Sequence, residues 1–216
     1  MNKFEILKKS LDLKYNPIGI KLIFENEANQ IPDKFKEPEN LQRYCAFVKK
    51  AAQGEFIKIK KGDFSCVTAE IMLGFKKPKK VEMNMRMNIK GLNSILLFPA
   101  NKYNMNNFES IILIVTPKNC MDIIEAHTRI FKKQLKISCG LYTGVCSEVT
   151  AQVIKAEKIN FSFLCSGSRF LTGFDECELF CGIPLKMISE IVKTIREISE
   201  ERKIDRTLIE QLKNHS

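Results

Sequence analysis

The sequence predicts an α+β domain in which a mixed β-sheet is flanked by helices. Two short apolar runs, residues 94–98 and 111–116, are typical of strands buried on both faces. Amphipathic helical patterns lie on either side of these runs along the chain. Strands and helices interleave too irregularly for a doubly wound parallel sheet. The length of 216 residues suits one domain over residues 1–216.

The first half of the chain is predicted to alternate helices and strands. The expected elements are a helix over 3–12, a strand over 18–22, a loop over 25–40, a helix over 45–53, a strand over 56–59 and a short helix after Cys66. Asn16-Pro17 ends the first helix, because the residue before a proline is pushed out of the helical region. Gly54 is a suitable C-cap for the second helix.

The second half is predicted to carry more helix. After a turn over 99–107, the expected elements are a helix from Pro117 to Leu135, a helix over 147–155, strands over 159–165 and 177–181, and C-terminal helices over 184–214. Met121, Ile124, Thr128 and Phe131 recur at spacings of three or four, which is typical of a helix with one buried face. Pro184 opens the next helix, and a separate short helix is expected from Asp205.

The charge balance favours a solvated lysine surface. The chain has 35 Lys and Arg residues against 25 Asp and Glu, a net charge of +10, and most of the excess is lysine. Lysine is less suited than arginine to forked readout of phosphates or bases. No nucleic-acid recognition motif accompanies the charge, which argues against a nucleic-acid partner. A basic scaffold or nucleic-acid-associated protein is kept as a second alternative.

The sequence also predicts a location. Its longest uninterrupted apolar run covers residues 111–115, far short of the roughly 20 residues that a bilayer span needs. The first residues mix Phe4 and Leu7 with lysines and have no continuous apolar core, so they do not form a secretory signal. We therefore expect a cytoplasmic protein without a membrane partner.

Eight cysteines are the residues that most need an explanation. In the reducing cytoplasm, cysteines at this density are expected as free thiols or metal ligands and not as a disulfide framework. Four of them occur in two segments with the same order of cysteine, helix, strand and cysteine. The segments are the predicted repeat units 45–75, with Cys45 and Cys66, and 146–170, with Cys146 and Cys165.

If the two units pack about a pseudo-twofold axis, the four thiols converge. The positive end of a helix favours a thiolate at Cys45 and Cys146, which open their predicted helices. Four soft ligands suit an iron–sulfur cluster or zinc. For the other four cysteines, Cys120, Cys139, Cys177 and Cys181, we expect packing as small hydrophobic residues, the last two on one face of a strand.

Several of these motifs also carry a family resemblance. The segments RYCAFVKKAAQGE, GVCSEV and LCSGSR, together with Cys66 and the following LGF, resemble the uncharacterised prokaryotic family known as domain of unknown function 169. The resemblance runs from NPIGIKL near residue 16 to the C-terminal helix near 198. The residues that match the motifs of the family are Cys45, Glu55, Cys66, Cys146, Cys165, Gly167 and Arg169. The resemblance implies a fold lineage and no activity.

The segment from Cys165 to Arg169 offers a second kind of site. The Cys165 thiol, a turn with Gly167, the hydroxyls of Ser166 and Ser168, and Arg169 would together suit an anion. The alternative is structural, with serines bonding within the turn and Arg169 paired to Glu55 or Asp175. A catalytic Cys–His pair lacks a suitable histidine, since His215 lies at the C-terminus and His127 is expected on a helix surface.

These features predict a cytoplasmic protein in which Cys45, Cys66, Cys146 and Cys165 hold an iron–sulfur cluster or zinc, with Arg169 tuning the site. Electron transfer or redox sensing with a redox partner would follow from a cluster. The alternative function is an enzyme or binding module that holds a small anionic ligand at Ser166, Gly167, Ser168 and Arg169. Whether the chain is an enzyme stays open at this point.

Overall fold

The computed structural model describes residues 2–78, 86–140 and 144–213, with side chains as far as residue 204. Its strands are β1 (Ile18–Phe24), β2 (Ile57–Lys60), β3 (Leu92–Pro99), β4 (Ser110–Val115), β5 (Asn160–Ser162) and β6 (Leu179–Pro184). They form one sheet in the order β2-β3-β1-β4-β6-β5. The predicted α+β class is confirmed. The sheet is antiparallel in every strand pairing and not mixed, because β3 separates β1 from β2, which share a direction.

The sheet has the same strand order when it is followed from its centre to either edge. One half runs β1-β3-β2 and the other β4-β6-β5, and β1 and β4 meet at the centre as antiparallel neighbours. The intervening elements also correspond: a helix with an early cysteine precedes each edge strand, and a short helix that follows a cysteine comes after it. The two halves therefore have matching topologies about an axis between β1 and β4.

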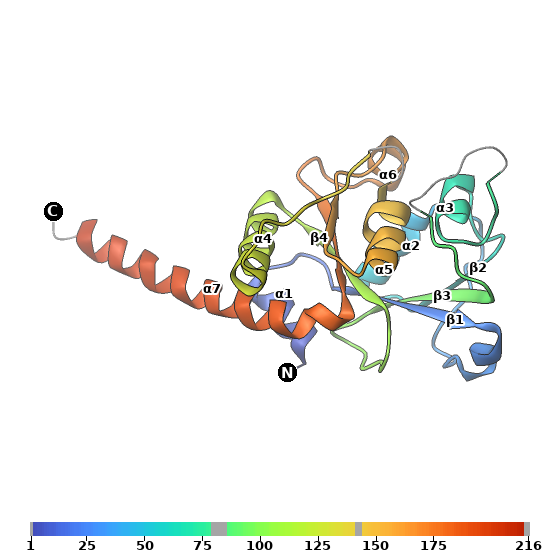
Figure 1. Ribbon diagram of the computed structural model, residues 1–216, viewed down its shortest axis with the longest axis horizontal. Coiled ribbons are helices and arrows are strands. Elements are labelled where there is room, and N and C mark those ends of the chain that lie inside the picture. The colour runs from blue at the N-terminus through green and yellow to red at the C-terminus, as the bar shows by residue number, and fades with distance from the viewer. Residues whose placement is uncertain (1, 79–85, 141–143, 214–216) are drawn as a thin grey trace.

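Helices cover both faces of the sheet (Figure 1). They are α1 (Lys3–Ser10), α2 (Tyr44–Gln53), α3 (Val67–Met72), α4 (Pro117–Phe131), α5 (Gln152–Ala156), α6 (Ser166–Thr172) and α7 (Leu185–Lys213), with a 3₁₀ helix η1 (Glu25–Gln30) and a π-helix η2 (Gly144–Ala151). One apolar core lies between the sheet and α2, α3 and η2. The other lies between the sheet and α1, α4 and α7. We refer to these as the cysteine face and the α7 face.

Local sequence signals explain where several helices begin and end. Gly54 ends α2 with a φ of 123°, a conformation that side chains other than glycine rarely adopt. Thr116 and Asn119 form a capping box at the start of α4. The Asn119 amide also donates a 2.6 Å hydrogen bond to the carbonyl of Leu11, so this cap joins α4 to the chain that follows α1.

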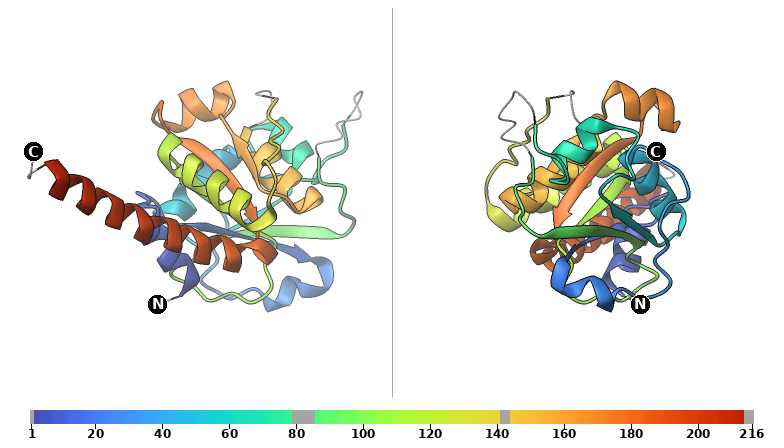
Figure 2. Two further views of the ribbon diagram at one scale, coloured as in Figure 1. Left: turned by 60° about the vertical axis from the view of Figure 1, so that its left-hand side comes forward. Right: turned by 90° about the vertical axis from the view of Figure 1, so that its right-hand side faces the viewer.

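The C-terminal region differs from the prediction of two helices. α7 is one helix of 29 residues, because no glycine or proline interrupts it; residue 214 lies outside the described residues. Arg202 of α7 pairs with Asp122 and Glu125 of α4. Beyond this contact the helix projects away from the sheet (Figure 1), while its first half runs beside α4 (Figure 2).

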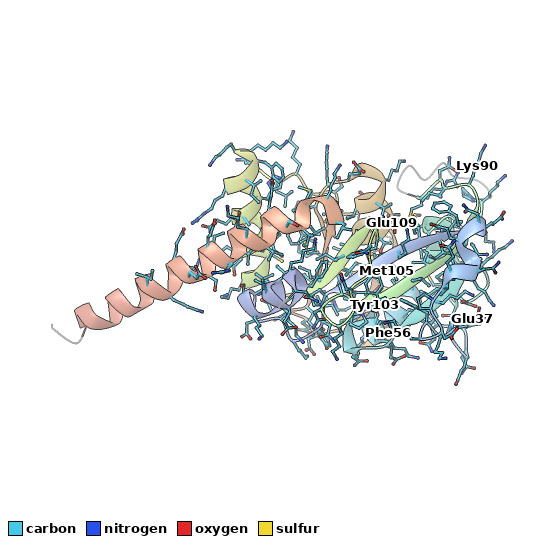
Figure 3. All side chains as sticks on the ribbon, turned by 90° about the horizontal axis from the view of Figure 1, so that it is seen from below. Glu37, Phe56, Lys90, Tyr103, Met105 and Glu109 are labelled. Atoms are coloured by element: carbon cyan, nitrogen blue, oxygen red, sulfur yellow. The ribbon has the colours of Figure 1, made fainter. Side chains whose placement is uncertain are left out.

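The sheet is buried on both faces by large side chains. The α7 face ends in an aromatic rim in which Tyr103 meets Phe56 edge to face at 5.6 Å, with Met105 nearby (Figure 3). β3 and β4 are almost wholly buried, as their apolar runs predict. Among the described residues, no helix has both the length and the apolar content to span a bilayer.

The π-helix η2 lies unusually close to the sheet. A Cβ atom added to Gly182 of β6 would stand 2.4 Å from the carbonyl oxygen of Val149 in η2. Real Cβ atoms do not approach a backbone oxygen so closely, so only glycine at this position lets the two backbones touch. Gly182 thereby fixes the height of η2, and of its cysteine, above the sheet.

We expect Gly182→Ala to destabilise the protein by about 1–3 kcal/mol, the usual cost of forcing extra atoms into a packed core. Urea unfolding followed by circular dichroism measures this change. Gly140→Ala is the matched control, because a Cβ at Gly140 meets nothing within 4 Å. Equal free energies of unfolding for the two variants would contradict the close approach of η2 to β6.

Candidate functional site

Equivalent positions in the two halves carry the four predicted cysteines. Cys45 is the second residue of α2, and Cys146 is the third residue of η2. Cys66 and Cys165 are the N-cap residues of the short helices α3 and α6. The predicted order of cysteine, helix, strand and cysteine is therefore present in both halves, with a π-helix in place of the first turns of the predicted helix over 147–155.

The other three predicted cysteines lie within electrostatic range of Cys146. Burial raises the pKa of the Cys146 thiol well above its usual range, and the charges of Cys66, Cys165 and Cys45 raise it further. Such an effect requires all three to lie near Cys146, although they come from three other elements. Cys45 and Cys146 are buried, whereas Cys66 and Cys165 are partly exposed. Two cysteines of the site are thus buried, and the other two are partly accessible to solvent.

The expectation of a stabilised thiolate at Cys146 is wrong for the protein without a bound cation. The cost of burying a negative charge exceeds the help from the start of a helix, so the thiol stays protonated at neutral pH. The thiolate-favouring position is instead Cys165. This difference arises because Cys146 sits inside its helix and faces the core, while Cys165 precedes one.

Hydrogen bonds surround the sulfur of Cys165. Burial opposes its ionisation, but bonds from the Ser168 hydroxyl and from the backbone N–H groups of Ser168, Gly144 and Gly167 together lower its pKa below the usual 9.0. The Ser168 Oγ lies 3.2 Å from the sulfur. Leu164, the residue before Cys165, has a φ of 71°, a strained value for leucine. Cys165 is therefore held in an anion-stabilising pocket of donors.

Glycines allow three chain segments to meet at this pocket. A Cβ added to Gly144 would stand 2.7 Å from the backbone nitrogen of Cys165, and one on Gly167 would stand 2.5 Å from an Arg43 Nη atom. The guanidinium of Arg43 thus lies against the turn of Cys165. No hydrogen bond or ion pair joins it to a described side chain, as far as the described residues extend. Its charge is available to an anion.

Arg169 bonds to backbone carbonyls and not to the carboxylates of the structural alternative. Its guanidinium donates to the backbone carbonyls of Phe163, Asp175 and Glu178, at 3.0 Å for the first and the last. It pairs with neither carboxylate of the structural alternative, Glu55 or Asp175. Arg169 therefore braces the loop after α6, and Arg43 is the arginine nearer the turn. Ser166 is exposed, and Ser168 is buried.

Two hydrogen bonds hold α6 onto α2. The Lys49 ammonium donates to the carbonyls of Thr172 and Gly173, at 2.8 and 2.6 Å, at the end of α6. The sulfur of Cys45 lies 3.1 Å from the Thr172 hydroxyl. Since Cys165 begins α6 and Thr172 ends it, Cys45 and Cys165 lie toward opposite ends of this helix. The sulfurs of Cys45 and Cys165 are therefore separated along the length of α6.

This separation limits what the cysteines can hold. Among the residues that the structure describes, no three Cys, His, Asp or Glu side chains are grouped closely enough for one metal ion. A tetrahedral zinc site needs four sulfurs at about 2.3 Å from the metal.

Polar residues that sequence reasoning missed anchor η2. The carboxylate of Glu148 is fully buried and accepts hydrogen bonds from the Gly140 N–H and the Ser162 hydroxyl. The Tyr44 hydroxyl lies 3.1 Å from the hydroxyl of Thr150, which bonds back to the carbonyl of Val145. The only signals in the sequence are their positions beside the cysteines, Tyr44 before Cys45 and Glu148 after Cys146.

The remaining cysteines do not all pack in the core. Cys181 is buried and Cys120 partly buried, which agrees with the expected packing role. Cys139 and Cys177 are exposed, so that expectation is wrong for them. Cys177 does not share a strand face with Cys181 because β6 begins only at Leu179.

Exposed apolar side chains flank the cysteines. Val67 directly follows Cys66 and is 55% exposed, and Phe163, two residues before Cys165, is 50% exposed. On α6, Phe170 and Leu171 are 80% and 67% exposed. Large apolar side chains this exposed are typical of surfaces that contact another molecule.

We expect the Cys165 thiol to react with iodoacetamide at lower pH than the Cys139 thiol. Hydrogen bonds lower the pKa of Cys165, whereas burial and the charge of Glu148 raise that of Cys139. Peptide mass spectrometry across a pH series would place the midpoint of alkylation below 9.0 for Cys165 and above it for Cys139. Ser168→Ala should move the Cys165 midpoint upward. A Cys165 midpoint equal to that of Cys139 would sink the proposed donor pocket.

Comparison with known proteins gives one match. The family model for domain of unknown function 169, described as uncharacterised ArCR, matches residues 6–194. Neither a curated protein nor a solved structure was found to match the chain. The matched region includes the whole sheet and all four cysteines of the site. The chain therefore belongs to the uncharacterised ArCR family, domain of unknown function 169.

Proposed function

We propose that this protein binds an iron–sulfur cluster at Cys45, Cys66, Cys146 and Cys165 and uses it in electron transfer or redox sensing. The observation that carries the proposal is that equivalent positions in the two halves of the sheet bear the four cysteines, Cys45 with Cys146 and Cys66 with Cys165. Thiolates are the usual ligands of such clusters. A bound cation would offset the cost of burial that keeps Cys146 protonated, and the smaller repulsion from the other cysteines.

We propose a cluster in preference to zinc. No three of these side chains are grouped for one ion within the described part of the chain. A cluster holds its ligand sulfurs around a larger body than a single ion does. The hydroxyls of Thr172 and Ser168, which contact the sulfurs of Cys45 and Cys165, would tune its potential, because hydrogen bonds to ligand sulfurs do so in known clusters.

The surroundings of the cysteines support a redox partner. Val67, Phe163, Phe170 and Leu171 offer apolar contact area on the segments that carry Cys66 and Cys165. Weak electron-transfer complexes bury small interfaces, for which these exposed side chains are available. Eight free cysteines suit a reducing compartment, so we place this function in the cytoplasm.

The test is anaerobic reconstitution of the full chain with ferrous iron and sulfide. We expect a brown protein with about four iron atoms per chain if the cluster is of the cubane type. Loading should also release protons, because Cys146 is a neutral thiol beforehand. Iron analysis, visible absorption and electron paramagnetic resonance after reduction measure the result.

Serine variants of the four cysteines provide the controls. Cys146→Ser and Cys66→Ser should each lower the iron content sharply, while Cys177→Ser, at an exposed position, should not. The Cys45→Ser variant tests whether Cys45, which contacts Thr172 at the end of α6, is a ligand. Failure of the wild-type chain to take up iron and sulfide, with its fold intact by circular dichroism, would refute the proposal.

A second function is favoured by the donor pocket at Cys165. Its lowered pKa and the nearby Arg43 guanidinium suit a thiolate nucleophile acting on a small anionic ligand, or a module that binds one. Of the residues predicted to hold an anion, Ser168 and Gly167 supply hydrogen-bond donors. Ser166 is exposed and Arg169 bonds to the loop, so Arg43 takes the place predicted for Arg169.

Inorganic phosphate is a direct probe of this second function. We expect phosphate to slow alkylation of Cys165 by iodoacetamide in the wild-type chain and to have no such effect in Arg43→Gln. Chloride at equal ionic strength controls for screening, which weakens exposed charge interactions regardless of site. Protection that persists unchanged in Arg43→Gln would rule out Arg43 as the anion ligand.

A further inference from the structure

A groove on the α7 face lies apart from the cysteines. Its volume is about 760 Å³, and it is formed by the end of α4, the segment after it, residues 157–159 and the start of α7. Its apolar wall consists of Phe131, Leu135, Ile159 and Met187. Small-molecule sites in proteins commonly have volumes of about 300–1,000 Å³ and mostly apolar linings. The groove has the size and wall of a ligand site.

His127 is the polar group in this wall, and the prediction that it lies on the helix surface is wrong. Only 6% of its surface is exposed, and its ring stacks near Phe131 at 4.8 Å. Its Nδ1 atom is buried and has no hydrogen-bond partner among the described residues. Burial lowers the pKa of His127, and the charge of Lys133 lowers it further, so the ring is neutral. A buried polar atom normally has a partner, so the Nδ1 atom of His127 is an exception in this wall.

The rim of the groove is positively charged. Lys133, Lys136, Lys158 and Lys186 line it, against one acidic residue, Glu157. Glu157 is paired with Lys186. The other three lysines are exposed and form no ion pair with any residue in the described ranges. The groove therefore combines an apolar wall with three uncompensated cations.

We propose that this groove binds a single-chain amphiphilic anion, either a fatty carboxylate or an alkyl phosphate. The apolar tail would pack against Phe131, Leu135 and Met187, and the head group would meet the lysines of the rim. A concave pocket of this volume suits a small molecule better than a protein surface.

The groove is independent of the proposed cluster. Ile159, Leu135 and Met187 belong to the core on the α7 face, while the four cysteines lie on the cysteine face. Neither site shares a side chain with the other. A ligand in the groove can therefore be tested in protein that carries no iron.

Calorimetric titration of the full chain with dodecanoate and with dodecyl phosphate, both below micelle formation, tests the proposal. We expect one binding site for at least one of them and none for dodecyltrimethylammonium, which has the same tail and the opposite charge. Binding of one anion alone identifies the head group. Binding of neither anion, or equal binding of the cation, overturns the proposal.

Matched variants locate the site. Lys133→Glu combined with Lys136→Glu should weaken anion binding about tenfold, since each rim charge contributes up to about 1 kcal/mol. Lys77→Glu combined with Lys90→Glu makes the same change of net charge at exposed lysines elsewhere and should leave affinity unchanged. Equal affinities for the two double variants overturn the proposal.

Two further measurements keep the test decisive if a variant unfolds. Leu135→Asp should abolish binding, whereas Ile137→Asp, two residues along at a position 47% exposed, should not. In the wild-type chain, added salt should weaken binding of the anion, because exposed charges are screened. Affinity that is insensitive to both salt and Leu135→Asp overturns the proposal.

Discussion

The contact of η2 with the sheet is the constraint on which the cysteine site depends. Gly182 lets the η2 backbone lie on β6, and Gly144 lets its first residue touch the backbone of Cys165. Any side chain at either position would lift the π-helix and carry Cys146 away from the other three cysteines. The buried carboxylate of Glu148 then holds this position by bonding to Gly140 and Ser162. π-Helical turns are rare and concentrate at functional sites, which agrees with their use here.

The two halves have matching topologies but different chemistry. Cys66 and Cys165 occupy the same place before a short helix, yet only Cys165 has a hydroxyl three residues later; the equivalent residue in α3 is Ala69. Cys45 and Cys146 also correspond, but one bonds to Thr172 and the other faces a buried core. Local sequence differences have thus given the corresponding cysteines of the two halves different surroundings.

Much of the fold could be predicted from sequence because the signals are local. The apolar runs of β3 and β4, the glycine cap of α2 and the proline start of α4 act within a few residues. The π-helix could not be predicted, since GVCSEVTA has no pattern that separates it from an α-helix. Burial of His127 depends on residues 157–159 and α7, which lie far along the chain, and the role of Arg43 depends on a glycine in the other half.

The seam between the halves is short. β1 pairs with β4 through three residue pairs, from Ile18 with Ile112 to Ile20 with Ser110, whereas β1 pairs with β3 through seven and β4 with β6 through six. β5 at the edge also pairs with β6 through only three residue pairs, so the seam is the shortest pairing between strands inside the sheet. A group that bridges cysteines from both halves would hold the two sides of this seam together. How firmly the two halves of the domain stay together would then depend on what its cysteines bind.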